Sequence, residues 1–227
     1  MSSKDLRTAR KALKWSQKRA ALRLGVSQPY LSLLEKGKRP MPEELVKKAV
    51  TTFRLSVTKL PLPEKPEPRR VDFAKQLAAL GYPGFAYMRR GWRRNPAEVL
   101  LEALGHGNLE ARVVEALPWL LLQYSDMNRE WLITHARLRN LSNRLGFVVT
   151  LAMKVLERRG ETSNAPYRDL HALETELQQS RLDRDDEVFG QTSVSPRELE
   201  WLRQNRVREA EYWHLLTDWR PEYLQYA

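Results

Sequence analysis

Apolar residues recur at helical spacing along most of this 227-residue chain. Between residues 4 and 60 the pattern predicts five short helices. Further along it predicts helices over residues 70–80, 96–105, 109–124, 128–138, 142–159, 166–182 and 196–218. Prolines at 96, 166 and 196 fit the first turn of a helix, and no alternating apolar run is bounded by hairpin turns. We therefore predict an all-α chain with essentially no sheet.

A proline-rich stretch divides the chain. Prolines occupy positions 61, 63, 66 and 68, and each biases the residue before it toward extended backbone. Such a stretch forms a semi-rigid spacer. The pattern predicts an N-terminal domain over residues 1–60, a linker over 61–69 and a larger helical domain over 70–227. Because the helices of the larger domain come in pairs of similar length, we expect a bundle or a short stack of helical hairpins.

Charge is distributed unevenly between these two domains. Residues 1–70 contain 18 Lys or Arg and 6 Asp or Glu, whereas residues 71–227 contain 21 and 22. The net charge of +11 therefore resides in the first third of the chain. A basic excess confined to one small folded segment favours a polyanion as partner. We interpret the N-terminal domain as a nucleic-acid-binding module.

Composition argues against several other kinds of site. The chain has no cysteine, which excludes disulfides and thiolate metal sites. Its four histidines stand alone, and it has no glycine-rich phosphate loop and no Gly-x-Ser-x-Gly motif. We expect no metal, no cofactor and no enzymatic activity. The first residues do not form a secretory signal and the apolar runs are too short to cross a membrane, so we expect a soluble, cytoplasmic protein.

Residues 16–37 meet the requirements of two short helices packed at a sharp angle. Ser16 and Ser27 precede the two helices and can cap their free amides. Gly25 lies between them, where the turn needs a residue that accepts a positive φ. Ala21 is small enough for the helix backbones to approach. The apolar seam between the helices is expected from Leu22, Val26, Leu31 and Leu34.

These residues resemble a known family. Residues 6–60 are similar to the lambda-repressor-like, Cro/C1-type (Xre family) helix-turn-helix domain. The matching positions are Gln17, Ala21, Gly25, Leu31 and Leu34, followed by Glu35-Lys-Gly-Lys-Arg-Pro40. Many spaced positions agree, so the match is specific, although it covers only about a quarter of the chain. The resemblance implies that the protein binds double-stranded DNA and regulates transcription, with a recognition helix that begins at Gln28.

The resemblance also implies which residues contact DNA. They are Gln17, Ser27, Gln28, Pro29, Ser32, Leu33, Lys36, Lys38 and Arg39. The amide of Gln28 can pair with an adenine edge, whereas Pro29 and Leu33 can touch only thymine methyls or sugar. Gln17 is expected to bind a phosphate near the amides of its helix, and Lys36, Lys38 and Arg39 are expected to bind backbone phosphates.

Other residues of this domain are expected to be structural. In this family, the positions of Arg10 and Glu35 often carry an ion pair, and we expect that role here. Trp15 and Phe53 are expected in the core, because a duplex does not present open base faces to them. Tyr30 can either stack on the sugar-phosphate backbone or fill the seam between the helices.

The larger domain carries six of the seven tryptophans, and most of them are expected in its core. Its last residues, 219–226, combine aromatic residues with arginine and proline, a composition typical of interface anchors. Packing of this tail on its own domain is an equal alternative. A second basic cluster, at residues 89–94, is interpreted first as a charged loop, next as a site for an acidic partner, and last as a contact to DNA beside the operator.

Three functions are compatible with these features. Repressors of this family usually act as homodimers on near-palindromic operators, and the larger domain could hold the dimer. Our leading hypothesis is an autoregulating repressor that acts as an antitoxin, with the larger domain binding a toxin protein. The alternative is a regulator that senses a small molecule, which predicts an enclosed apolar pocket. A DNA-targeted enzyme would need a cleft of perturbed titratable residues.

Overall fold

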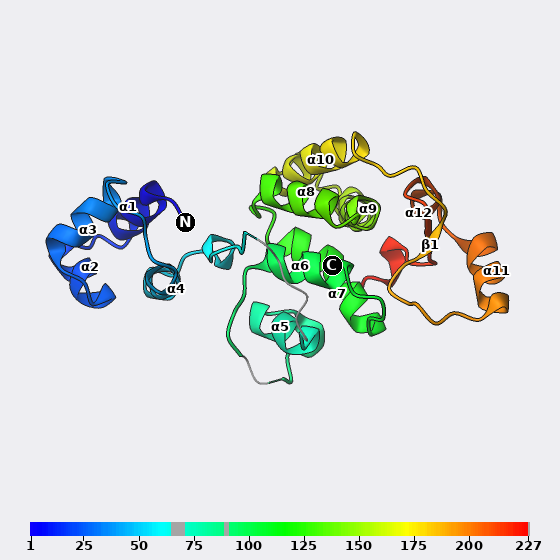
Figure 1. Cartoon of the computed structure of the whole chain (residues 1–227), viewed down its shortest axis with the longest axis horizontal. Coiled ribbons are helices and arrows are strands. Elements are labelled where there is room, and N and C mark those ends of the chain that lie inside the picture. The colour runs from blue at the N-terminus through cyan, green and yellow to red at the C-terminus, as the bar shows by residue number, and fades with distance from the viewer. Residues whose placement is uncertain (65–70, 89–90, 227) are drawn as a thin grey trace. The chain divides into compact units, whose positions relative to one another are not determined.

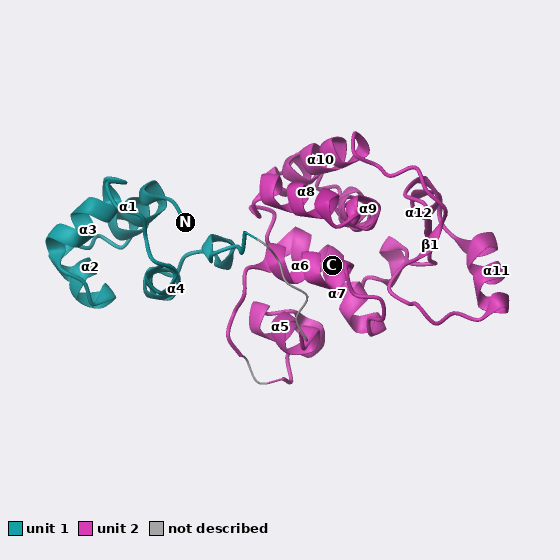
Figure 2. Cartoon of the chain, in the orientation of Figure 1, with its two compact units in different colours: residues 1–64 teal, residues 65–227 magenta. Residues whose placement is uncertain are grey.

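The chain divides into two compact units, residues 1–64 and 65–227 (Figure 2). The computed structural model describes residues 1–64, 71–88 and 91–226. Most of the predicted linker, from residue 65 onward, lies outside the described residues. So do the predicted helix start at residue 70 and the first two arginines of the basic cluster, Arg89 and Arg90.

The secondary structure of unit 1 is entirely helical. Its elements are α1 (Ser3–Ala12), α2 (Gln17–Leu24), α3 (Gln28–Glu35), α4 (Glu43–Thr52) and the 3-10 turn η1 (Val57–Lys59) (Figure 1). The fifth of the predicted helices is therefore this single turn. An N-terminal capping box fixes the start of α1, where Ser2 accepts from the amide of Asp5 and the Asp5 carboxylate accepts from the amide of Ser2.

The core of unit 1 is assembled from all four α-helices. Its buried members are Leu6, Ala9, Ala20, Ala21, Leu24, Leu31, Leu34, Ala49 and Phe53. Trp15 is half-buried and packs against Phe53, with ring centroids 5.6 Å apart, so these two rings do contribute to the core. Tyr30 also packs against this cluster, which favours the second of its two interpretations.

Unit 2 begins with helices that follow the predicted pattern closely. They are α5 (Phe73–Leu80), the 3-10 turn η2 (Pro83–Phe85), α6 (Pro96–Leu104), α7 (Ala111–Gln123), α8 (Arg129–Leu138), α9 (Ser142–Arg158) and α10 (Ala165–Gln178). The central helix is α9, which buries 13 of its 17 residues. It packs against α6, α7, α8 and α10, so this part of unit 2 is a bundle built around α9 (Figure 1).

The last predicted helix, 196–218, is shorter in the structure and gives way to other elements. The chain forms α11 (Pro196–Asn205), α12 (Arg208–Tyr212), β2 (Leu215–Leu216) and the 3-10 turn η3 (Pro221–Tyr223). Strand β2 pairs in parallel with β1 (Glu187–Val188), a small addition to the otherwise helical fold. The break between α11 and α12 follows from Arg206, whose backbone is extended and whose side chain pairs with Asp186 at 2.6 Å.

The aromatic tail packs on its own unit. Leu224 is buried, and the ring of Tyr226 meets that of Tyr82 edge-on at 5.6 Å. The amide of Gln225 donates to Oε1 of Glu115 at 2.9 Å. Tyr223 and Tyr226 remain partly exposed. In the part of the chain that the structure describes, no helix is both long and apolar enough to cross a membrane.

Candidate nucleic-acid interface

Helices α2 and α3 are set at their angle by local features of the sequence. The Ser16 hydroxyl accepts from the amide of Arg19 at 3.1 Å and starts α2. Gly25 ends α2 with φ 72° and ψ 34°, the left-handed conformation that a side chain disfavours. The Ser27 hydroxyl then accepts from the amide of Tyr30 at 3.3 Å and starts α3. These three predicted roles are confirmed.

Helix α3 has a buried face and an outer face. Leu31, Leu34 and Glu35 are buried against the rest of unit 1. The predicted DNA-reading residues lie elsewhere on the helix: Gln28 and Pro29 are exposed, and Ser32 and Leu33 are half-buried. Pro29 lies in the first turn, where its missing N–H interrupts no helical hydrogen bond. The helix therefore presents its N-terminal end and one side to a ligand.

One predicted seam residue is wrong. The Leu22 side chain is 80% exposed, whereas Leu24, which the sequence interpretation left out, is 2% exposed and belongs to the core. Both leucines lie on α2, and the rotation of this helix against α3 and α4 decides which is buried. Val26 is half-buried and packs against the core, and Leu31 and Leu34 are buried, as predicted.

A chain of hydrogen bonds connects the outer face of α3 to the interior. Gln28 donates through Nε2 to Oε1 of Gln17 at 2.8 Å, and Gln17 donates through Nε2 to Oε2 of Glu35 at 2.9 Å. Arg10 completes the chain with two bonds to Glu35, at 2.5 and 2.9 Å. The predicted Arg10–Glu35 ion pair is therefore present. Its connection to Gln17 and Gln28 was not foreseen, since the two bonds join residues 18 and 11 positions apart that no local pattern links.

The ion pair holds Glu35 in its charged form. Burial by itself would raise the pKa of the Glu35 carboxyl, but hydrogen bonds from Arg10 and Gln17 outweigh it and lower this pKa below its ordinary value. The hydrogen bond to Glu35 correspondingly raises the pKa of Arg10. At neutral pH this charged, bidentate pair is a rigid anchor for the Gln17 amide.

The two glutamine side chains keep hydrogen-bonding capacity for DNA. Gln28 uses one of its amide protons on Gln17, which leaves a second N–H and the carbonyl oxygen. One donor and one acceptor in a plane are what an adenine edge requires in the major groove. Gln17 likewise retains one N–H beyond its bond to Glu35.

A short basic segment follows α3 directly. The amide of Lys38 donates to the carbonyl of Leu33 at 2.9 Å and folds the chain back at the helix end. Lys36, Lys38 and Arg39 are all exposed, and none of them forms an ion pair with a described residue. Three uncompensated cations at the end of α3 favour a phosphate backbone as their partner.

In the described part of the second basic cluster, the arginines Arg93 and Arg94 bind residues of unit 2. Arg94 binds Glu98 and Glu102 with contacts of 2.6 Å, and Arg93 donates to the carbonyl of Ala79 at 3.1 Å. Burial opposes the charge of Arg94, yet the hydrogen bonds that it donates to both glutamates raise its pKa. These two arginines are therefore structural. Trp92 in the same segment is 84% exposed.

Comparison with known proteins identifies one part of the chain. Residues 6–60 match a family model described as helix-turn-helix, the same range in which the sequence resemblance was found. No curated protein and no solved structure matches the chain.

Proposed function

We propose that the protein is an autoregulating repressor. This is a finer assignment than the DNA-binding transcriptional regulator that the helix-turn-helix match over residues 6–60 supports. The observation that carries this proposal is the outer face of α3, where Gln28 is held by Gln17 on a strongly basic unit. Repression follows if an operator for this helix overlaps the promoter of the chain's own gene.

Specific recognition is assigned to the start of α3. Gln28 pairs its free N–H and carbonyl oxygen with an adenine in the major groove. Pro29 and Leu33 contact thymine methyls or sugar, and Ser32 reaches a base edge or the backbone from the next turn. Ser27 caps the start of the helix, and we assign it to the edge of the groove.

Non-specific affinity is assigned to residues on both sides of α3. Gln17 binds one phosphate at the start of α2, while Lys36, Lys38 and Arg39 bind phosphates beyond the end of α3. Phosphate contacts on both sides of α3 fix its position along the DNA major groove. This division predicts that affinity depends strongly on salt while sequence preference resides mainly in Gln28.

Unit 2 is assigned two tasks. A dimer on a near-palindromic operator must place two recognition helices roughly 34 Å apart, and unit 2 is the larger element available to hold them. The second task is binding of a protein, as in an antitoxin that neutralises a toxin. Support for this comes from its large exposed aromatic side chains, of which Tyr87 is 75% and Trp92 84% exposed.

The proposal is tested with the full chain in two experiments. Footprinting on the promoter of its own gene should reveal a protected near-palindrome, and random genomic DNA of equal length should show none. Affinity purification of the tagged chain from its host, followed by mass spectrometry, should yield one stoichiometric protein that is toxic when expressed alone. Recovery of the chain with DNA only would contradict the antitoxin role and leave a plain repressor.

A further inference from the structure

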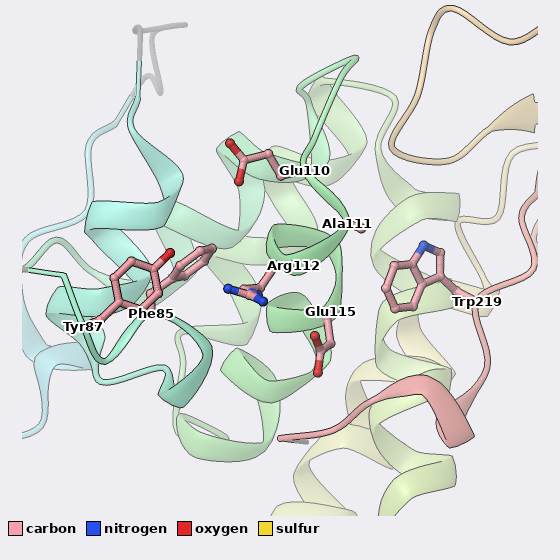
Figure 3. A pocket seen from close by; sticks show the side chains of 7 residues that line it. All are labelled: Phe85, Tyr87, Glu110, Ala111, Arg112, Glu115 and Trp219. Carbon is pink, nitrogen blue, oxygen red and sulfur yellow. The ribbon is translucent and has the colours of Figure 1, made fainter.

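A depression of about 420 Å³ lies on the surface of unit 2. It is bounded by the first turns of α7, the segment after η2 and the C-terminal segment. The lining residues are Phe85, Tyr87, Glu110, Ala111, Arg112, Glu115 and Trp219. Figure 3 shows Phe85 and Tyr87 on one side, Trp219 on the other, and Arg112 and Glu115 between them on α7.

The guanidinium of Arg112 has most of its donors available. Its hydrogen bond in the described residues is a long one, 3.5 Å to the carbonyl of Gly84, and no described carboxylate forms an ion pair with it. Its carbon Cζ lies 6.0 Å from the ring centroid of Phe85. A guanidinium placed against an aromatic ring is oriented, and oriented guanidinium groups bind carboxylates through two parallel hydrogen bonds.

The neighbouring Glu115 does not act as the carboxylate partner of Arg112, although it is one turn away on the same helix. Its Oε1 accepts from the amide of Gln225 at 2.9 Å, which directs it toward the tail. Its charge also acts on buried Tyr82: burial raises the pKa of the Tyr82 hydroxyl, and Glu115 raises it further. Glu115 therefore belongs to the contact that holds the tail. The other carboxylate of the lining, Glu110, is exposed at the start of α7 and forms no ion pair with Arg112 among the described residues, so the guanidinium stays available to an external anion.

The walls of the depression indicate what carries that anion. Tyr87 is 75% exposed, so a small molecule bound here would remain largely in water, whereas small-molecule sites bury most of their ligand. Tyrosine, tryptophan and arginine are the side chains enriched at the centres of protein interfaces. An open site of these three residue types fits a protein segment better than a free metabolite.

We propose that this depression docks a protein partner by binding a carboxylate side chain on Arg112, with flanking apolar side chains against Phe85, Tyr87 and Trp219. The assignment rests on the proposed function, in which unit 2 binds a partner. It names the part of unit 2 that does so and the chemistry of the segment it accepts.

The test uses the full chain and two synthetic peptides, acetyl-Phe-Glu-Phe-amide and its Gln counterpart. Binding is followed by the indole N–H signal of Trp219 in ¹⁵N-labelled protein, assigned with a Trp219→Phe variant. The Glu peptide should shift this signal and bind at least about tenfold more tightly than the Gln peptide, because a guanidinium binds a charged carboxylate more strongly than a neutral amide. Arg112→Gln should remove this preference.

Matched variants separate the site from general charge effects. Arg137→Gln removes an exposed arginine of α8 outside the depression, and it should bind the Glu peptide like the wild type. Glu115→Gln should bind it more tightly, because a nearby negative charge is lost. Equal binding of the two peptides, or no shift of the Trp219 signal, would overturn the proposal. Tighter binding of free phenylacetate than of the peptide would also overturn it and assign the depression to small molecules.

The failure of this site and the failure of the proposed function give different results. Arg112→Gln should keep wild-type affinity for operator DNA and lose the stoichiometric partner in affinity purification. If the variant still purifies with that partner, the docking site is wrong while partner binding by the chain stands. If the wild type yields no partner at all, partner binding itself is contradicted, whatever the peptides do.

Discussion

At the scale of single residues, base recognition and backbone binding are assigned to different side chains, and substitutions can separate them. Gln28 retains one donor and one acceptor for a base, while Lys38 carries an exposed charge that forms no ion pair with a described residue. A side chain that reads a base affects one position of the operator. A side chain that binds phosphate affects every sequence alike.

Gln28→Ala should relax sequence preference at one base pair of each half-site. The loss in discrimination there should be about 1–3 kcal/mol, the contribution of one bidentate contact. Binding-site selection from randomised DNA, wild type against variant, measures it. Unchanged preference at all positions would show that Gln28 does not read a base.

Lys38→Ala should weaken binding to operator and random DNA by the same factor. Loss of one phosphate contact should also reduce the slope of log K against log salt by about 0.9 for each site bound. Affinities measured over a series of salt concentrations on both DNAs test this. A loss confined to the operator would assign Lys38 to base reading instead.

The buried ion pair beneath the interface should control the stability of unit 1. The Arg10 and Glu35 side chains are 12% and 2% exposed, so Arg10→Met leaves a buried charge unpaired and should cost about 3–5 kcal/mol in the free energy of unfolding. Arg10→Met combined with Glu35→Leu should recover much of this loss. Urea unfolding of the three proteins measures the difference, and additive losses would contradict the pairing.

This pair also predicts a dependence on pH. Because the folded pKa of Glu35 is lowered from its ordinary value of 4.5, its contribution to stability is complete above that value. The contribution is lost as pH falls below 4.5 and through the folded pKa. The double variant lacks the carboxylate. On acidification the unfolding free energy of the wild type should therefore fall relative to that of the double variant.

At the scale of elements, local sequence rules predicted the ends of the two helices of the helix-turn-helix. They failed where packing against distant helices decides which side chain is buried. Ser16, Gly25 and Ser27 act on their own neighbours, so their roles could be read from the sequence. Leu22 and Leu24 have the same chemistry, and only contacts with distant helices bury one and expose the other. The Gln28–Gln17–Glu35–Arg10 chain is likewise long-range. The family resemblance indicated the Arg10–Glu35 pair, but no local pattern indicated its connection to Gln17 and Gln28.

Helix α9 is held to α12 by a close approach that a side chain would prevent. A Cβ on Gly146 would lie 2.4 Å from the ring of Trp213, whose indole N–H donates to Oγ1 of Thr150 at 3.0 Å. Gly146→Ala should displace this ring and lower the unfolding free energy of unit 2 by about 1–3 kcal/mol. Near-ultraviolet circular dichroism during urea unfolding reports on this, since unit 2 holds six of the seven tryptophans.

A matched glycine provides the control for this packing contact. Gly91 is exposed, and a Cβ there would meet nothing within 4 Å, so Gly91→Ala should leave stability unchanged. Adding Trp213→Phe to Gly146→Ala should restore part of the loss by making room. If Gly146→Ala proves as stable as the wild type, the close contact does not hold α12 in place.

At the scale of the whole molecule, the change in charge and the prolines near residue 60 indicated two parts, and the chain does divide into units at residues 64 and 65. The end of unit 2 could not be predicted in the same way. The apolar periodicity of residues 196–218 predicts one helix, but Arg206 binds Asp186 and β2 pairs with β1. These contacts bring together segments that no local pattern connects.

Cutting the chain between the units should show that unit 1 recognises the base sequence, while the full chain is needed for tight binding to the whole operator. Residues 1–64 alone should fold, because they contain their own core, and should bind a single half-site with the base preferences of the full chain. The full chain should bind the complete operator about 100-fold or more tightly, since linking two binding modules makes the second event intramolecular. Quantitative footprinting with both proteins on half and full sites measures this. Equal affinity for the full site would contradict dimer formation through unit 2, and would leave each helix-turn-helix domain to act alone.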